Sequence, residues 1–265
     1  MIALITGASG GLGRTMAAEC ARRGYDLYLT DLHLQPLRDL ACGIQRQYGV
    51  TVYTHACDLT NSVEAGALFE RLDRENIRLN MLLNIAGVDY EGAFLSRESE
   101  TLIKIVQLNI EATMRVTHAA LKRRAEGAFH IINVSSLASL YPIPLKATYA
   151  ASKRFLLDFS MALGHEVAAQ NVHVLALCPG GLPTTKEALS GIEAQGFWGR
   201  ATTNELSVVA RNTLSRALRK KRMYIPGVVN RTLSVLGKLI PGAWIARLLY
   251  ARWNAAQQKW LQTAQ

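Results

Sequence analysis

Tyr149 and Lys153 are the residues whose types and spacing most directly suggest chemistry. They stand four positions apart, so in a helix they would share one face. Free tyrosine, with a pKa of about 10, is seldom ionised at neutral pH, but a fixed cation beside it favours the phenolate. Such a phenol could give a proton to a carbonyl oxygen or take one from a hydroxyl group. Tyrosine and lysine at this spacing often merely share a helix surface. The surrounding sequence therefore has to show whether Tyr149 and Lys153 form a catalytic pair.

A glycine-rich segment, Thr6–Gly13, lies between the first predicted strand and the first predicted helix. Glycine permits backbone conformations closed to other residues and lets the chain approach a ligand closely. The helix N-terminus behind it offers unpaired N–H groups and a partial positive charge, which suit a pyrophosphate. Tight turns also use glycine for structural reasons alone, but a position after the first strand of a βαβ unit favours nucleotide binding.

Short apolar runs alternate with segments of helical length, which predicts βαβ units and a doubly wound parallel sheet in one α/β domain. The predicted strands are Ile2–Thr6, Leu27–Thr30, Val52–Ala56, Met81–Ile85, Phe129–Val134, Val172–Leu177 and Met223–Pro226. The predicted helices are Leu12–Arg23, Leu34–Tyr48, Val63–Glu75, Leu102–Arg124, Ala150–Ala169 and a last one that runs from a capping box, Thr202 with Glu205, to Arg219.

The spacing of Gly7, Gly11 and Gly13 resembles the T-G-x-x-x-G-x-G signature of the classical short-chain dehydrogenase/reductase family. It differs from the G-x-G-x-x-G of the general dinucleotide fold. Tyr149 and Lys153 are similar to the catalytic pair of that family. The resemblance implies a Rossmann-type fold and an oxidoreductase that transfers hydride between NAD(P)(H) and a ketone or secondary alcohol.

The same resemblance implies a role for each catalytic residue. Tyr149 would be the general acid/base, and Lys153 would lower its pKa and bind the nicotinamide ribose. Ser136, thirteen residues before Tyr149 at the end of a predicted strand, would orient the substrate oxygen. Ser135 is the less favoured candidate, and a serine that only caps the turn is the alternative. Asn109 would hold a water for the proton relay, unless it is a solvent-facing amide.

Further similarities extend from residue 6 to residue 184. Asn84-Ile85-Ala86-Gly87 is similar to N-N-A-G, with Ile85 in place of the second asparagine, which leaves the stabilising role of that amide in doubt. Pro179-Gly180 with Thr184 is similar to P-G-x-x-x-T at the nicotinamide, and Asp58 matches an adenine-contacting aspartate. The resemblance places the cofactor against Thr6, Gly7, Ser9, Gly11, Leu12, Gly13, Asp31, Asp58, Leu59, Asn84, Ala86, Gly87, Tyr149, Lys153, Pro179, Gly180 and Thr184.

Asp31, at the end of the second predicted strand, bears on the choice of cofactor. A carboxylate there can accept hydrogen bonds from the adenosine ribose and would repel a 2′-phosphate. The positions that often carry a basic residue in NADP-dependent members hold Gly10 and Leu32. NAD is therefore favoured over NADP. Asp31 could instead only cap the following turn, and Arg14 is close enough to assist a phosphate.

The segment 185–201, after the sixth predicted strand, is expected to cover the substrate. It contains Leu189, Ile192, Phe197 and Trp198 among glycines. Apolar side chains on such a loop favour a mobile lid over an apolar or lipid-like substrate. They could equally be the core-facing side of a fixed loop.

Residues 228–265 are expected to form a basic, amphipathic helical extension of the domain 1–227. From residue 206 to the end there are 11 Lys/Arg and no Asp/Glu, so the preceding residues hold 30 − 11 = 19 basic and 20 acidic groups. Packing of the extension over the pocket or a subunit is favoured. The alternative is peripheral contact with an anionic membrane, with Trp244, Trp253 and Trp260 at headgroup level.

The rest of the composition limits the function classes. No uncharged apolar run is long enough for a transmembrane helix, and the N-terminal strand leaves no room for a signal peptide. The four scattered cysteines fit free thiols and no metal site. We therefore expect a cytoplasmic enzyme, a homodimer or homotetramer formed through its long helices, with no nucleic-acid partner.

A cofactor-binding sensor or scaffold with little turnover is the competing hypothesis. The intact set of Ser136, Tyr149 and Lys153 argues against it, because a protein that only binds the cofactor has no need of an activated tyrosine.

Overall fold

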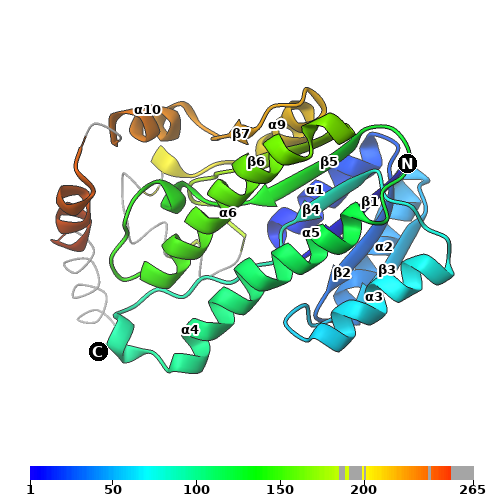
Figure 1. Ribbon diagram of the computed structural model, residues 1–265, viewed down its shortest axis with the longest axis horizontal. Helices are drawn as coiled ribbons and strands as arrows, with labels where there is room; N and C mark the ends of the chain where they lie inside the picture. The colour runs from blue at the N-terminus through cyan, green and yellow to red at the C-terminus, as the bar shows by residue number, and fades with distance from the viewer. Residues whose placement is uncertain (185–188, 191–198, 200, 238–239, 252–265) are drawn as a thin grey trace.

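Seven parallel strands form one sheet in the order β3-β2-β1-β4-β5-β6-β7 (Figure 1). The computed structural model describes residues 1–184, 189–190, 199, 201–237 and 240–251. The strands are β1 (Ile2–Thr6), β2 (Asp26–Asp31), β3 (Val52–Ala56), β4 (Met81–Asn84), β5 (Phe129–Val134), β6 (Val172–Leu177) and β7 (Met223–Tyr224). Four have the predicted bounds and the others differ by one or two residues at an end. The predicted Rossmann-type, doubly wound α/β fold is confirmed.

Helices cover both faces of the sheet (Figure 1). One face packs against α1 (Gly11–Arg22), α2 (Leu34–Tyr48) and α9 (Leu206–Leu218). The other packs against α3 (Ser62–Arg74) and α5 (Thr113–Leu121), with α6 (Ala147–Glu166) beside β6. The remaining elements are α4 (Ser99–Val106), α10 (Val228–Leu236) and the 3₁₀ turns η1 (Phe94–Ser96), η3 (Leu137–Leu140) and η4 (Ala168–Gln170).

Successive residues of each strand belong to different cores. Ala3 and Ile5 of β1 pack with α1, α2 and α9, whereas Leu4 between them packs with α3 and α5. Both sides of the strand are therefore buried, which explains why the strands appear in the sequence as continuous apolar runs.

The strand order reverses at β1, which pairs with β2 on one side and with β4 on the other. The crossovers leave in opposite directions from this point, so a crevice opens at the carboxyl ends of β1 and β4. Thr6 and Asn84 are the last residues of these two strands and are paired with each other. The glycine-rich turn therefore begins where an α/β fold of this kind binds its ligands.

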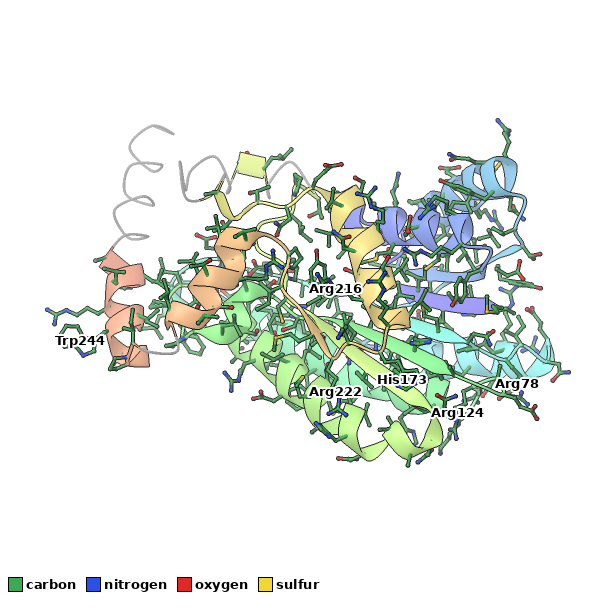
Figure 2. The ribbon with its side chains drawn as sticks, turned by 90° about the horizontal axis from the view of Figure 1, so that it is seen from above. Arg78, Arg124, His173, Arg216, Arg222 and Trp244 are labelled. Atoms are coloured by element: carbon green, nitrogen blue, oxygen red, sulfur yellow. The ribbon has the colours of Figure 1, made fainter. Side chains whose placement is uncertain are left out.

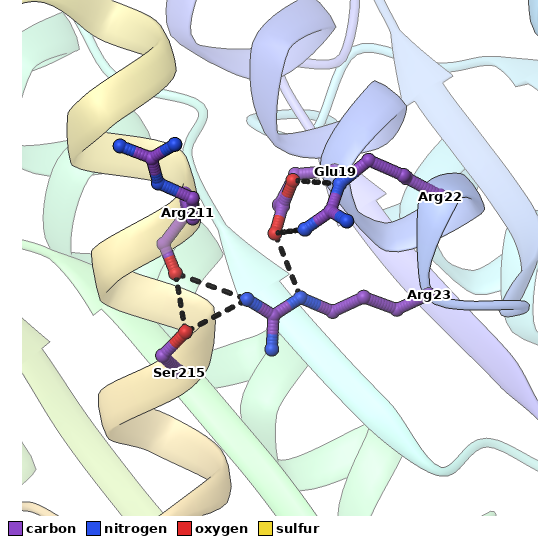
Figure 3. Close-up of polar contacts among 5 residues, drawn as sticks. All are labelled: Glu19, Arg22, Arg23, Arg211 and Ser215. Atoms are coloured by element: carbon purple, nitrogen blue, oxygen red, sulfur yellow. Dashed lines mark hydrogen bonds and ion pairs between the residues drawn. The ribbon is translucent and has the colours of Figure 1, made fainter.

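A polar network holds α9 against α1 (Figure 3). Glu19 accepts hydrogen bonds from Arg22 of the same helix and from Arg23 at its C-cap. Arg23 also donates to the carbonyl oxygen of Arg211, at 3.1 Å, and to Ser215 Oγ, at 2.8 Å. These guanidinium groups lower the pKa of Glu19. The network helps to fix α1, which begins at the glycine-rich turn.

Two helix predictions are wrong in kind, and the others differ from the structure by at most three residues at an end, as Ala150–Ala169 does from α6. The predicted helix Leu102–Arg124 is α4 and α5 joined by a π-helical segment, η2 (Gln107–Ala112). The predicted capping box at Thr202 is wrong, because α9 begins at Leu206 and Glu205 stands at its N-cap without a side-chain cap.

The C-terminal residues form α10 and a second helical stretch, 242–251, separated by residues that include Ile240 and Pro241. Asn230 of α10 is fully buried, so the first turns of this extension pack against the domain. Every helix among the described residues is too short or too polar to cross a membrane.

Candidate active site

The turn from β1 to α1 has a shape that only glycine allows. Gly7 has a φ of +64°, and a Cβ there would lie 2.7 Å from the backbone nitrogen of Ala86. A Cβ on Gly13 would lie 2.0 Å from the carbonyl oxygen of Gly7. Gly10 at the N-cap has no side chain to cover the first turn of α1, so its N–H groups can face an anion. This cradle fits the pyrophosphate of a dinucleotide.

Asp31 at the end of β2 lies directly beside the turn. Its Oδ2 accepts hydrogen bonds from Ser9 N, at 2.9 Å, and Ser9 Oγ, at 2.6 Å. Its Oδ1 accepts one from Leu32 N at 2.7 Å, so the carboxylate also caps the turn that follows it. Arg14 Nε donates to the carbonyl oxygen of Ser9. The carboxylate is half-exposed, and its contact with an adenosine ribose stays a prediction.

The side chains of Thr6 and Asn84 support the site from inside the fold. Thr6 Oγ1 accepts from the backbone nitrogens of Ile85 and Ala86, at 3.1 and 3.2 Å, and so joins β1 to the turn after β4. Asn84 Nδ2 donates to Asn133 Oδ1 at 2.8 Å and also to Thr117 Oγ1. Both predicted cofactor residues are buried, so direct contact with a cofactor would fall to their backbone atoms.

Asp58 and Leu59 follow β3 on the same edge of the sheet. Asp58 Oδ1 accepts from the backbone N–H and the hydroxyl group of Thr60, which lowers the pKa of the carboxyl. Leu59 is buried in the core beneath α3. The adenine contact predicted for these residues stays a prediction.

Helix α6 places Tyr149 and Lys153 beside the end of β5. Lys153 is only 5% exposed, and its Nζ donates to the carbonyl oxygen of Val134 at 2.9 Å. The same Nζ lies 5.7 Å from the centre of the Tyr149 ring. The predicted pair therefore shares one face of the helix, and that face is turned toward the crevice side of β5.

The two serines after β5 have different environments. Ser135 is buried, and its hydroxyl donates to the carbonyl oxygen of Lys153 at 2.7 Å. Ser136 is half-buried and forms the hydrogen bond that lowers the pKa of Tyr149. Ser135 thus anchors α6 on the sheet, while Ser136 is the serine that faces the phenol.

The protonation of the pair differs from the sequence-based expectation. Burial, and after it the carboxylate of Asp89, raise the pKa of Tyr149 to about 12, against the lowering by Ser136 and Lys146. Burial lowers the pKa of Lys153 to about 8. Lys146 is a further cation that lowers the pKa of the phenol, and the lowering expected from Lys153 stays a prediction.

Lys146 was not identified from the sequence. Its Nζ lies 2.6 Å from Asp89 Oδ2, 3.2 Å from Glu91 Oε2 and 5.7 Å from the centre of the Tyr149 ring. This ion pair joins the loop after β4 to the start of α6. The spacing of three between Lys146 and Tyr149 puts them on one helix face, which is the signal that could have identified it.

Asn109 is fully buried in the π-helical segment η2, so the solvent-facing alternative is wrong. Its side chain accepts from Val88 N and donates to Val88 O and Ser152 Oγ, at 2.9, 3.0 and 3.0 Å. A Cβ on Gly87 would lie 2.9 Å from Asn109 Oδ1 and 3.3 Å from Lys153 Nζ. The amide therefore ties the loop after β4 to α6, and a role in holding a relay water stays a prediction.

The segment after β6 closes the site near the glycine turn. A Cβ on Gly11 would lie 2.9 Å from Thr184 Cα, so Thr184 rests on the N-terminal turn of α1. The carbonyl oxygen of Pro179 accepts from Leu137 N at 2.7 Å. A Cβ on Gly180 would meet the carbonyl oxygen of Thr202. The segment predicted to hold the nicotinamide, which ends at Thr184, therefore lies next to the glycine turn predicted to hold the pyrophosphate.

Comparison with known proteins agrees with this geometry. The sequence model of the short chain dehydrogenase family matches residues 1–191. The chain belongs to the short-chain dehydrogenase/reductase family. A very-long-chain 3-oxoacyl-CoA reductase of Laccaria bicolor is 32% identical over 177 residues, which are 65% of this chain and 52% of that protein. A human 3-oxoacyl-[acyl-carrier-protein] reductase is 29% identical over 181 residues, 68% of this chain and 74% of that one.

Solved structures of short-chain dehydrogenases have the same fold. One from Sphingobium yanoikuyae, in complex with NADPH, has a TM-score of 0.73 at 30% identity and covers 89% of this chain and 92% of its own. A bulky-bulky ketone specific alcohol dehydrogenase from Comamonas testosteroni has a TM-score of 0.75 at 26% identity, with 91% and 95% covered. The chain spans only a third to about half of the length of the first curated relatives that it matches.

The segment 185–201, predicted to be a lid over the substrate, is described only at residues 189–190, 199 and 201. Ile192, Phe197 and Trp198 lie outside the described residues, and Leu189 is exposed. Sequence reasoning also missed Asn230, whose Nδ2 donates to the carbonyl oxygen of Thr202 at 3.0 Å, directly above Gly180.

Proposed function

We propose that the chain is an NAD(P)(H)-dependent oxidoreductase that transfers hydride between the nicotinamide and a ketone or secondary alcohol. The observation that carries this proposal is the arrangement of Ser136 and Lys153 around the ring of Tyr149, at the carboxyl edge of the sheet. The glycine cradle supports it, because added Cβ atoms at Gly7 and Gly13 would collide with the backbone and so break the turn that a dinucleotide fold uses for the pyrophosphate.

The bound nicotinamide supplies or accepts the hydride at the carbonyl carbon. Ser136 Oγ hydrogen-bonds the substrate oxygen and holds it beside the phenol. Tyr149 donates its proton to that oxygen during reduction and takes the proton back during oxidation. Because burial keeps its pKa at about 12, the phenol carries the proton that reduction requires at neutral pH. Lys153 binds the ribose and, while charged, stabilises the phenolate left after the transfer.

NAD is the cofactor that the chain's own residues favour. Asp31 sits next to the cradle with a half-exposed carboxylate, and a 2′-phosphate there would meet a like charge. Relatives of known structure bind NADPH as well as NAD, so the preference rests on Asp31 and has to be measured for this chain.

The substrate we propose is a ketone with an apolar or lipid-like chain. A cavity of about 530 Å³ lies between α6 and the helical stretch 242–251, lined by Ala147, Ala150, Ala151 and Arg154 on the side of α6 away from Tyr149. It is an apolar surface next to the site and does not include the catalytic residues. Its walls are mostly apolar, with Leu140, Pro142 and Ile143 among them. The very-long-chain 3-oxoacyl-CoA and bulky ketone substrates in the names of relatives support this class.

The proposal is tested with a panel of ketones and alcohols read out by nicotinamide absorbance. Tyr149→Phe should keep its affinity for NAD(H) and lose at least about a hundredfold in kcat, the scale of general acid–base catalysis. Ser136→Ala should also lower kcat. Ser135→Ala is the matched control, because it removes the buried anchor to Lys153 O and should lower stability by about 1 kcal/mol with little change in kcat. Equal rates for wild type and Tyr149→Phe would instead support a cofactor-binding sensor.

Two finer proposals complete this function. We propose a homodimer or homotetramer assembled through α4, α5 and α6, which size-exclusion chromatography with light scattering can check. We also propose a cytoplasmic enzyme whose core domain is residues 1–227, with residues 228–265 as an extension.

A further inference from the structure

The C-terminal extension has one side that packs on the domain. Tyr141 Oη donates to the carbonyl oxygen of Leu233, and a Cβ on Gly237 would collide with the Tyr141 ring. Asn230 Nδ2 donates to the carbonyl oxygens of Thr202 and Pro226 and to Asn204 Oδ1. These contacts hold α10 in place, so its other side has a fixed orientation.

The outward side of the extension exposes large apolar side chains. We define the tail face as the exposed apolar residues Val235, Leu236, Ile240, Trp244 and Leu248. Trp244 is 74% exposed and Leu248, one helical turn later, is 72% exposed. Figure 2 shows Trp244 at the end of the molecule formed by the extension, remote from Arg78 and Arg124 at the other end. Exposed apolar side chains gathered in one patch mark a surface that binds a partner, so the tail face suits an apolar or interfacial partner.

The charge of the extension indicates which partner. Residues 228–265 contain five Lys/Arg and no Asp/Glu. Arg247 is exposed and lies on the same helix face as Trp244 and Leu248. Apolar and aromatic side chains accompanied by cations alone are complementary to anionic lipid headgroups over acyl chains. A self-association face with this composition would set like charges against each other.

We propose that the tail face docks on an anionic lipid bilayer, with Trp244 and Leu248 inserted at headgroup level and Arg247 against lipid phosphates. The inner side of the same helix supports the arrangement, because Ala246 lines the apolar cavity next to α6. Docking by the tail face would bring this apolar cavity close to the lipid surface.

Co-sedimentation with vesicles tests the proposal without reference to catalysis. Wild type should pellet with vesicles of phosphatidylcholine and phosphatidylglycerol and much less with phosphatidylcholine alone. The double variant Trp244→Ser/Leu248→Ser should lower the partition coefficient at least about tenfold, and Arg247→Glu should lower it at least about fivefold, and only with the anionic vesicles. Added salt should weaken the binding of wild type.

A matched control is Val63→Ser, which removes an equally exposed apolar side chain, 78% exposed, from α3. It should leave pelleting unchanged, and circular dichroism should show all variants folded. The proposal is overturned if the double variant pellets like wild type. It is also overturned if the double variant lowers the oligomeric mass in light scattering while wild type ignores the vesicles, because the tail face then binds a second copy of the chain.

Discussion

Lys153→Met should make the protein more stable at neutral pH while removing its activity. Burial lowers the pKa of this amine from 10.5 to about 8, so its pKa in the folded chain is about 2.5 units below that in the unfolded chain. At 1.36 kcal/mol per unit, holding the charge inside the fold costs about 3 kcal/mol below pH 8. Methionine has a similar length and no charge. Loss of the hydrogen bond to Val134 O offsets about 1 kcal/mol, which leaves a net gain of about 2 kcal/mol.

The pH dependence of this gain has a definite sign. Between pH 8 and pH 10.5 the unfolded wild type holds a proton on Lys153 that the folded wild type has lost. Wild-type stability therefore rises with pH in this window relative to the variant, and the difference closes near the upper end. Below pH 8 both states are charged and the full difference remains.

Urea unfolding followed by circular dichroism, at about pH 7 and again at about pH 10, measures this difference. Comparing wild type with the variant at each pH cancels the contribution of every other titrating group. Lys122→Met, at an exposed lysine after α5, is the control and should stay within about 0.5 kcal/mol of wild type at both values. A variant that is no more stable than wild type at neutral pH, or a gain that does not shrink with pH, would refute the argument from burial.

Three further predictions concern the glycines, the cofactor and the phenol. Gly13→Ala should lower the free energy of unfolding by more than about 3 kcal/mol, because its Cβ would meet the carbonyl oxygen of Gly7. Gly66→Ala in α3, where nothing lies near the added Cβ, should instead raise the free energy of unfolding by about 1 kcal/mol. Thermal unfolding measures both changes. Asp31→Ala should lower the ratio of kcat/KM for NAD over NADP at least about tenfold, and an unchanged ratio would contradict its assignment. Asp89→Asn removes a carboxylate that raises the pKa of Tyr149, so the pH profile of alcohol oxidation should move to lower pH; a move to higher pH would show that the carboxylate acts in another way.

Most strands could be predicted because their physical signal is local. Each strand between two helical layers is buried on both faces, so its residues are apolar throughout, and the bounds of Ile2–Thr6 and Phe129–Val134 follow from that alone. The C-terminal end of β7 could not be predicted in this way, because Ile225 and Pro226 continue the apolar run after the pairing with β6 has stopped.

The π-helical turn at Asn109 could not be predicted from a helical pattern. It is set by bonds to Val88 and Ser152, which are distant in sequence and come together only in the fold. The capping box failed for a related reason: the carbonyl oxygen of Thr202 accepts a hydrogen bond from Asn230, and the helix starts four residues later.

The site could be predicted as a set of residues but not as an electrostatic arrangement. Spacing identified Tyr149, Lys153 and Ser136, and the structure brings these three together. It could not show that burial would dominate both pKa values, nor that Lys146 would reach the ring from the opposite end of the first helical turn with Asp89 as its partner. Burial and charge pairing across the loop after β4 depend on tertiary structure.

The amide of Asn230 links the predicted nicotinamide site at Gly180 to α10, which carries part of the tail face. A Cβ on Gly180 would lie 2.7 Å from Asn230 Nδ2, so α10 and the turn after β6 cannot shift independently. If lipid binding changes the affinity for the nicotinamide nucleotide by some factor, thermodynamic linkage requires that nucleotide binding change the affinity for lipid by the same factor.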